Sequence, residues 1–278
     1  MRRGALAWNA AAWVFPTLTV LLPLVSFLAI SFWKVENNAL VPTFTLANYA
    51  EIFNNEIYLR VLSGTGILAL QVMLACLLLG YPVALFVWRR QGLVRWALLF
   101  ATALPLFLGY IIKLYAIRSL LGPMGFINQA LLAVGLLDRP STALLFNQRA
   151  VLITMAMVYL PFAVLPIFLS LERVPKGLLA ASADLGASEW QTFRHVVLPL
   201  SLPGTIVGGL FAVVLAMGDF VTPQMVGGTT GFTYGRAIQS QFGMAFNWPF
   251  GAALAVLLLA ASLIVIGLGD WIQNRNRT

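Results

Sequence analysis

Few side chains in this sequence have the types and spacing that covalent chemistry requires. The chain has one histidine, His195, and one cysteine, Cys76, which excludes a His-based metal cluster, a CxxC metal site and an internal disulfide. No nucleophile with a neighbouring base is visible. The G-x-x-x-x-G-K-[ST] loop that holds nucleotide phosphates is also missing. We therefore expect no catalytic residue, no metal site, no cofactor bound by this chain and no ATP hydrolysis.

Two ionisable side chains lie inside apolar runs, where a charge is costly and by default functional. Lys113 and Asp219 fall roughly 25 and 22 Å into their runs at ~1.5 Å per residue, so they should reach a similar depth. One interpretation is a structural ion pair between them. The sharper hypothesis is that Asp219 lines the outward mouth of a pathway and attracts a cationic solute. Its expected neighbours are Lys113, Phe220, Thr222 and Pro223, and Pro223 should break the helix there.

The most patterned polar stretch runs from Pro175 to Pro203. Pro175 suits the first turn of a helix, and Gly186 should end that helix. The residues Ser188 to Gln191 fit a capping box, which predicts a second helix that stops before Pro199. A run of small side chains would let another protein approach closely: Ala180, Ala181, Ser182, Ala183 and Ala187. The alternative is a helical hairpin that rests on lipid headgroups.

The composition of the chain indicates that these residues lie on, or between, helices in a membrane. The 278-residue chain is 60% hydrophobic and 9% charged, with a mean hydropathy of +0.90, whereas soluble domains carry about 25% charged residues. Such a chain belongs in a bilayer, where each helical span needs ~20 mostly apolar residues. The net charge of +8 bears on orientation and does not indicate nucleic-acid binding, because the basic residues are scattered between apolar runs.

The apolar runs predict an all-α integral membrane protein with a single transmembrane domain over residues 1–278. Six spans are expected, at about 10–33, 61–88, 96–118, 150–171, 204–226 and 249–270. The segment 119–149 is too interrupted by glycine and proline to span. Residues 172–203 form the long loop between the fourth and fifth spans.

The distribution of basic residues predicts the orientation. With both termini on one side, that side holds ten basic residues outside the spans: Arg2, Arg3, Arg89, Arg90, Arg95, Arg173, Lys176, Arg194, Arg275 and Arg277. The opposite side holds six: Lys34, Arg60, Arg118, Arg139, Arg149 and Arg236. The positive-inside rule therefore places both termini and the loop 172–203 in the cytoplasm.

The loop also carries a motif. In GASEWQTFRHVVLP nine residues separate Gly186 from Val196, and Leu198 and Pro199 follow. This resembles the signature loop of permease subunits of binding-protein-dependent ABC importers, written EAA, three residues, G, nine residues, I-x-L-P. The chain departs from that pattern at Ala180, which stands where the motif has glutamate, and Asp184 is the nearest acid. We call residues 172–203 the coupling loop, because in that family this loop docks in a groove of the cytoplasmic ATPase.

Three further stretches are similar to the spermidine/putrescine-type permeases of the same family: Leu120 to Leu137, Leu215 to Gly228 and Asn247 to Leu254. The resemblance implies the type I importer fold in a bacterial inner membrane. It also implies a second related permease, two ATPases that bind ATP and Mg, an extracytoplasmic solute-binding protein and a polyamine or similar cation as solute. The residues expected to couple to the ATPase are Ala180, Ala181, Ser182, Asp184, Leu185, Gly186, Ser188, Phe193 and Pro199.

Other functions stay open at this point. A secondary transporter or channel that works alone often shows inverted repeats and several charges in the membrane, and neither is evident here. A membrane-embedded enzyme would need a nucleophile with a base or a metal cluster. Within the importer family, opines, other organic cations, phosphonates and metal chelates are alternative solutes.

Overall fold

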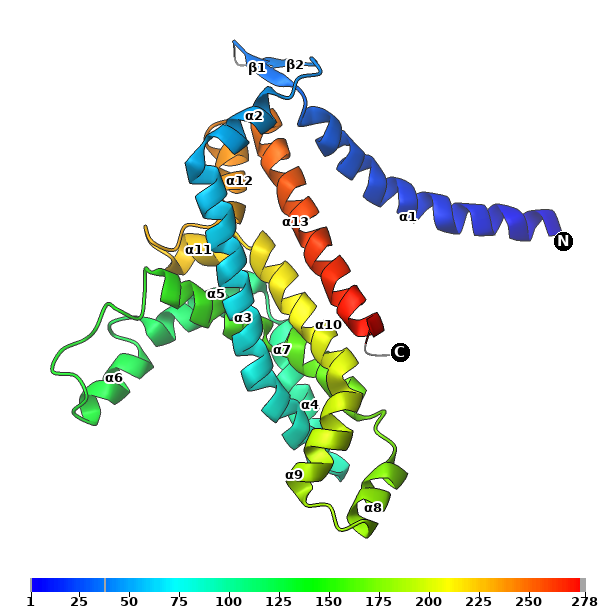
Figure 1. Cartoon of the computed structure of the whole chain (residues 1–278). Helices are drawn as coiled ribbons and strands as arrows, with labels where there is room; N and C mark the ends of the chain where they lie inside the picture. The colour runs from blue at the N-terminus through cyan, green and yellow to red at the C-terminus, as the bar shows by residue number, and fades with distance from the viewer. Residues whose placement is uncertain (1, 38, 276–278) are drawn as a thin grey trace. The chain divides into compact units, whose positions relative to one another are not determined.

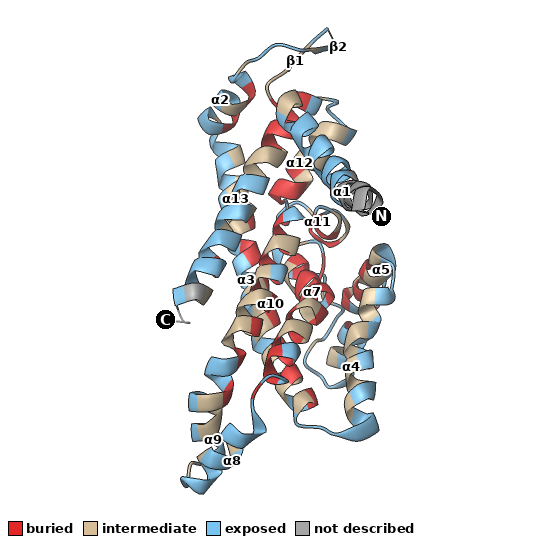
Figure 2. Ribbon diagram, turned by 90° about the vertical axis from the view of Figure 1, so that its right-hand side faces the viewer, coloured by how far each residue is buried: buried red, intermediate tan, exposed pale blue. Residues whose placement is uncertain are grey.

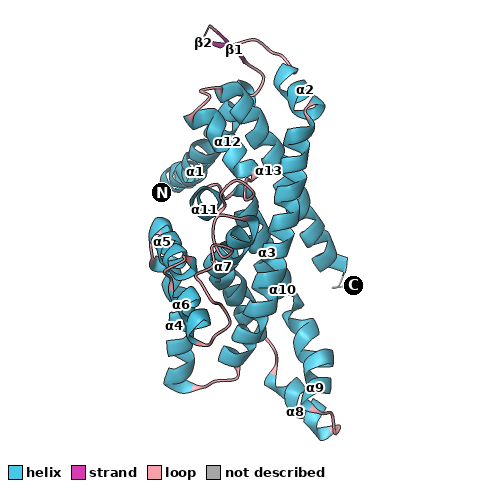
Figure 3. Ribbon diagram, turned by 90° about the vertical axis from the view of Figure 1, so that its left-hand side faces the viewer, coloured by secondary structure: helices cyan, strands magenta, loops and turns pink. Residues whose placement is uncertain are grey.

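A computed structural model describes residues 2–37 and 39–275 of the chain. Apart from one small hairpin, the described residues form helices and the loops that join them (Figures 1 and 3). The chain divides into two compact units. The first unit is Met1–Arg60 with Ala237–Ala261, and the second is Val61–Arg236 with Ser262–Thr278.

The first unit begins with a long helix and a hairpin. Its N-terminal elements are α1 (Arg2–Ile30), β1 (Lys34–Glu36), β2 (Ala39–Val41) and α2 (Ala47–Asn54). The two strands pair antiparallel, with Lys34 opposite Val41. The side-chain amide of Asn48 donates to the carbonyls of Ser31 at 2.8 Å and Trp33 at 2.9 Å. These bonds satisfy the carbonyls left open where α1 ends, and so fix α2 beside that end.

The second unit is a helical assembly. Its elements are α4 (Gly92–Phe107), α5 (Tyr110–Leu121), α6 (Phe126–Ala133), α7 (Gln148–Leu171), α8 (Lys176–Asp184), α9 (Glu189–Thr192), the π-helical turn η1 (Phe193–Val197), α10 (Leu198–Gly218) and α11 (Val221–Val226). Three helices have residues in both units: α3 (Glu56–Trp88), α12 (Tyr234–Gly243) and α13 (Trp248–Arg275).

The helix α7 is the most buried element of the second unit (Figure 2). It packs closely on α10 because two glycines of α10 meet its backbone. A Cβ atom on Gly204 would lie 2.3 Å from the carbonyl oxygen of Pro166, and one on Gly208 would lie 2.8 Å from that of Ala163. Both distances are too short for any side chain, so glycine at these two positions allows the helices to pack closely.

A hydrophobic core lies where α3 and α7 approach the coupling loop. Its buried members are Ala84, Val87, Val164, Ile167, Phe168, Leu171 and Val197. Leu179 and Phe193 of the coupling loop pack against it. Both halves of the loop therefore contact the same core as the membrane helices.

Among the residues that the structure describes, five stretches are long and apolar enough to cross a membrane: Glu56–Trp88, Tyr110–Ala133, Gln148–Leu171, Glu189–Gly218 and Trp248–Gln273. Thr17–Ile30 and Gly92–Phe107 are shorter apolar helices. The spans expected at 61–88, 150–171 and 249–270 coincide with α3, α7 and α13. The stretch 110–133 is divided into α5 and α6 by a turn at 122–125.

The expected single helix at 96–118 is wrong. The helix α4 ends at Phe107, Leu108 is extended with φ −82° and ψ 140°, and α5 begins at Tyr110. Pro105 removes a backbone donor from the last turn of α4, and Gly109 has a low helix propensity. Together they end the helix in the middle of an otherwise apolar run.

Candidate functional site

The first half of the coupling loop is the helix α8, which ends at Asp184, and the predicted glycine, Gly186, stops it there. Gly186 has a φ of +75°, a conformation that favours glycine. Its N–H donates to the carbonyl of Ala183 at 2.9 Å, and the N–H of Ala187 donates to that of Ser182 at 3.1 Å. This pair of bonds is a Schellman motif, which satisfies the last carbonyls of α8 and reverses the chain.

The second half begins with the predicted capping box. The hydroxyl of Ser188 accepts from the N–H of Gln191, and the side chain of Gln191 accepts from the N–H of Ser188. These reciprocal bonds satisfy two donors at the start of α9.

The predicted end of this second helix before Pro199 is wrong. The chain stays helical from α9 through η1 into α10, and Pro199 is the second residue of α10. Pro199 has no N–H to offer the preceding turn. The N–H of Leu198 reaches back to the carbonyl of Phe193, a π-type bond that widens the turn and accommodates the proline. The coupling loop is therefore one piece with the membrane helix that follows it.

A side-chain bond joins the two halves of the loop. The hydroxyls of Ser182 in α8 and Thr192 in α9 lie 2.7 Å apart. The outer surface of α8 is open: Ala180, Ala181, Asp184 and Leu185 are exposed. Leu185, at the tip, is 87% exposed. The loop is thus a braced hairpin that presents small side chains and one protruding leucine.

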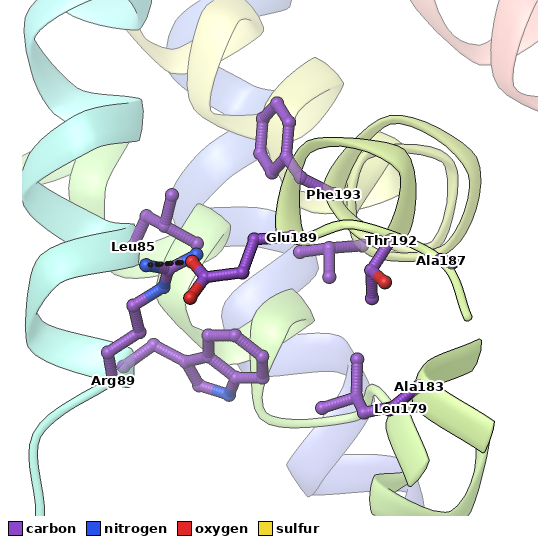
Figure 4. A pocket seen from close by; sticks show the side chains of 10 residues that line it. Leu85, Arg89, Leu179, Ala183, Ala187, Glu189, Thr192 and Phe193 are labelled. Carbon is purple, nitrogen blue, oxygen red and sulfur yellow. Dashed lines mark hydrogen bonds and ion pairs between the residues drawn. The ribbon is translucent and has the colours of Figure 1, made fainter. Parts of the chain in front are cut away.

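The loop is also attached to the end of α3 (Figure 4). The guanidinium Nη1 of Arg89 lies 3.4 Å from Oε2 of Glu189, and both residues line a cavity of about 500 Å³. Both side chains are mostly exposed, so this pair adds little stability and serves mainly to fix geometry. Phe193 packs edge-on against Tyr81 of α3, with ring centroids 5.9 Å apart.

A second attachment involves α4 and the end of α7. The guanidinium of Arg95 is paired with the carboxylate of Glu172, and it also lies 5.1 Å from the ring centroid of Phe168. This pair is more buried than the Arg89–Glu189 pair. The end of α3 and the first turn of α4 are therefore tied to the start of the coupling loop, at Glu172, and to α9, at Glu189.

The second candidate site surrounds Asp219, where α10 ends. The carboxylate oxygen Oδ2 accepts hydrogen bonds from the hydroxyls of Tyr110 at 2.6 Å and Tyr159 at 2.8 Å. The other oxygen, Oδ1, accepts from the N–H groups of Val221 at 2.9 Å and Thr222 at 3.0 Å. A carboxylate has about four acceptor positions, so the protein itself occupies them.

These bonds explain why the membrane helix breaks at this point. Asp219 is extended, with φ −74° and ψ 121°, and its side chain caps the start of α11. The predicted break at Pro223 is wrong, because Pro223 lies in the first turn of α11, where a missing N–H is tolerated. The span expected at 204–226 therefore consists of α10 and α11, with the break at Asp219 and Phe220.

The residues that were expected to line one pathway differ in their exposure. Asp219, Thr222 and Pro223 are buried, Lys113 is half-buried, and Phe220 is 40% exposed. The ammonium of Lys113 lies 5.5 Å from the ring centroid of Tyr110. No ion pair within 4 Å among the described residues joins Lys113 to Asp219. The expected ion pair is replaced by the two tyrosine hydroxyls.

The sequence analysis singled out neither Tyr110 nor Tyr159. Both are hydroxyl-bearing side chains within apolar helices. A buried hydroxyl needs a partner, and a nearby buried carboxylate is the natural one. The attachment of Glu189 to Arg89 was also missed, because the two residues are 100 positions apart.

The comparisons with known proteins agree with the motif. A family model described as "Binding-protein-dependent transport system inner membrane component" matches residues 2–278. The chain belongs to this family. It is 37% identical over 252 residues to the spermidine/putrescine transport system permease protein PotB of Escherichia coli K12, which covers 90% of each protein. It is 34% identical over 260 residues to PotB of Haemophilus influenzae, covering 92% of this chain and 90% of the relative.

Solved structures share the fold of this family member. A bacterial ABC transporter involved in the import of the acidic polysaccharide alginate has a TM-score of 0.79 at 17% identity, covering 99% of this chain and 96% of that one. The MetNI methionine ABC transporter has a TM-score of 0.60 at 19% identity, covering 78% and 95%. The chain is thus a multi-pass inner-membrane permease with a type I ABC importer fold.

Proposed function

We propose that this chain forms half of the translocation pathway of an ABC importer driven by ATP hydrolysis on partner subunits. One observation carries the proposal: the coupling loop continues without interruption into α10. The bond between Ser182 and Thr192 joins α8 to this helix. A force on the exposed face of α8 or α9 would therefore be transmitted to α10, as rigid-body switching requires.

The solute that we propose is a polyamine or a related organic cation. The support is the identity with permeases named for spermidine and putrescine. The proposed pathway passes the break between α10 and α11, with Phe220 and Lys113 nearest to the solute and the buried Asp219, Thr222 and Pro223 behind them. The charge of Asp219 would act on a cation from a distance, because its direct acceptor positions are occupied by protein donors.

The proposed assembly contains a second, related permease, two cytoplasmic ATPase subunits that bind ATP and Mg, and an extracytoplasmic solute-binding protein. We propose that residues 1–278 act in it as one permease domain with six spans. In that topology α1 is the first span and α4 with α5 is the third, and both termini and the coupling loop face the cytoplasm. Exposed apolar side chains such as Leu74, Leu78 and Leu263 would contact membrane lipid.

A stand-alone transporter or channel is the main alternative, and co-purification distinguishes the two. The tagged chain, isolated in mild detergent from cells that express the neighbouring genes, should bring an ATPase with it. Transport by the isolated chain in liposomes would contradict the proposal. For the solute, uptake of labelled spermidine should be inhibited by putrescine and not by an opine, a phosphonate or a metal chelate. Inhibition by one of these other solutes and not by putrescine would reject a polyamine as the solute. It would not contradict the proposal that the chain belongs to an ABC importer.

A further inference from the structure

A basic cavity lies beside the coupling loop, where α3 ends, α4 begins and α7 passes to α8. Its volume is about 580 Å³. Five charged side chains line it: Arg89, Arg90, Arg95, Lys176 and Glu172. Four cations and one carboxylate leave three positive charges in excess. Such a concentration of one sign in a hollow attracts anions.

The protein neutralises only part of this charge. Arg95 is paired with Glu172, and Arg89 reaches Glu189 on the rim. Among the described residues no ion pair within 4 Å involves Arg90 or Lys176, and both side chains are exposed. Arg90 lies over the ring of Phe86 at 4.4 Å, which orients it without cancelling its charge. Two cations, Arg90 in the turn after α3 and Lys176 at the start of α8, are thus left for an external anion.

The surroundings of the cavity indicate where that anion comes from. Trp88 lines the cavity, and Trp96 lies one turn into α4 and is 67% exposed. Tryptophans at span ends mark the level of the lipid headgroups. From the edge of the cavity, α4 exposes Leu93 (84%) and Phe100 (63%). A hollow with excess positive charge therefore adjoins an apolar surface at headgroup depth.

We propose that this cavity binds the phosphate headgroup of an anionic phospholipid, whose acyl chains lie along the exposed apolar face of α4. Arginine and lysine form charge-assisted bonds to phosphate oxygens, and basic pockets at the cytoplasmic ends of helices suit lipid phosphates. The bound phosphate would connect Arg90, in the turn between α3 and α4, to Lys176 of α8. The lipid would therefore brace the coupling loop against the membrane helices.

Lipid retention by the purified protein tests this site. The full chain and the assembled transporter are placed in nanodiscs of equal parts phosphatidylglycerol and phosphatidylcholine, extracted, and analysed for bound lipid by native mass spectrometry. The test variant is Arg90→Gln with Lys176→Gln, which leaves both ion pairs intact. The matched control is Arg173→Gln, because Arg173 is an exposed cation of the same loop that does not line the cavity.

Wild type and Arg173→Gln should retain phosphatidylglycerol in preference to phosphatidylcholine. The double variant should lose that preference by about fivefold for each cation removed. Equal retention in wild type and the double variant would overturn the proposal. Displacement of phosphatidylglycerol by millimolar inorganic phosphate would show a site for the free anion instead. Phosphatidylglycerol retained by the chain alone but not by the assembled transporter would show that an acidic surface of the ATPase occupies the cavity. That result would also overturn the lipid proposal.

Discussion

The hydroxyl of Tyr159 donates a 2.8 Å hydrogen bond to the carboxylate of Asp219, and so joins the middle of α7 to the break between α10 and α11. The two residues are 60 positions apart. Tyr110 brings α5 to the same carboxylate oxygen. One buried acid thereby holds three helices at the point where the membrane helix changes direction.

Tyr159→Phe should destabilise the permease without changing its shape. The substitution removes one hydroxyl from a buried carboxylate, and hydrogen bonds to charged groups contribute about 2 kcal/mol. The measurement is thermal unfolding in detergent, where the variant should melt several degrees below wild type. Tyr115→Phe is the control, because Tyr115 is 57% exposed. An equal decrease in melting temperature for both variants would reject a specific role for the Tyr159 hydroxyl.

Asp219→Asn should weaken uptake of a cation while the transporter still assembles. Asparagine keeps an acceptor for the N–H groups of α11 and removes the negative charge. At an effective dielectric of about 20 and a separation of about 12 Å, the lost attraction is about 1.4 kcal/mol, or about tenfold in apparent affinity. Labelled-solute uptake over a range of concentrations measures it. Unchanged uptake would show that the Asp219 carboxylate does not act on the solute.

Lys113→Gln should act in the opposite direction. The ammonium of Lys113 lies 5.5 Å from the ring centroid of Tyr110, and the proposed solute path passes beside it. Its removal relieves repulsion of a cationic solute, so the apparent affinity for spermidine should rise in the same uptake assay. A loss of uptake in Lys113→Gln would show that Lys113 does not act by repelling the solute.

Gly186→Pro should uncouple ATP hydrolysis from uptake. Gly186 has φ +75°, whereas proline is fixed near φ −65°, so the reversal between α8 and α9 cannot form. The chain should still insert, because the spans are unaffected. ATPase activity stimulated by the binding protein should persist in part while uptake is lost, and a bulky residue at Ala181 should have the same effect through the exposed face of α8.

The matched control for this position is Gly177→Ala. Gly177 is a helical glycine in the first turn of α8 with open space around its Cα, so alanine should fit. Its uptake should equal that of wild type. If ATP hydrolysis still drives uptake at the wild-type level in Gly186→Pro, the proposed role of the coupling loop is refuted.

The coupling loop was largely predictable because its signals are local. The end of α8 at Gly186 and the capping box at Ser188 both depend on residues within a few positions, and both are confirmed. The continuation through Pro199 was not predictable by the usual rule for proline, because a π turn accommodates it. Rules that depend on neighbouring residues therefore predict the helix caps well, but they do not predict the π turn that accommodates Pro199.

The Asp219 site was less predictable for the same reason. The sequence analysis predicted a helix break at Pro223, because proline is a strong local signal. The site instead depends on hydrogen bonds to Asp219 from Tyr110 and Tyr159, which are distant in sequence. The division of 96–118 into α4 and α5 also depends on weak signals, Pro105 and Gly109, within an apolar run. Hydropathy identifies a run of membrane length and does not show where a helix within it is interrupted.

The most direct test of the account is reconstitution into proteoliposomes of this chain with the proposed second permease, the ATPase and the binding protein. Labelled spermidine should accumulate only when ATP is on the ATPase side and the loaded binding protein is on the other side. The same assembly with Gly186→Pro should hydrolyse ATP with little accumulation. Equal accumulation by the chain alone, without ATPase or binding protein, would contradict the account.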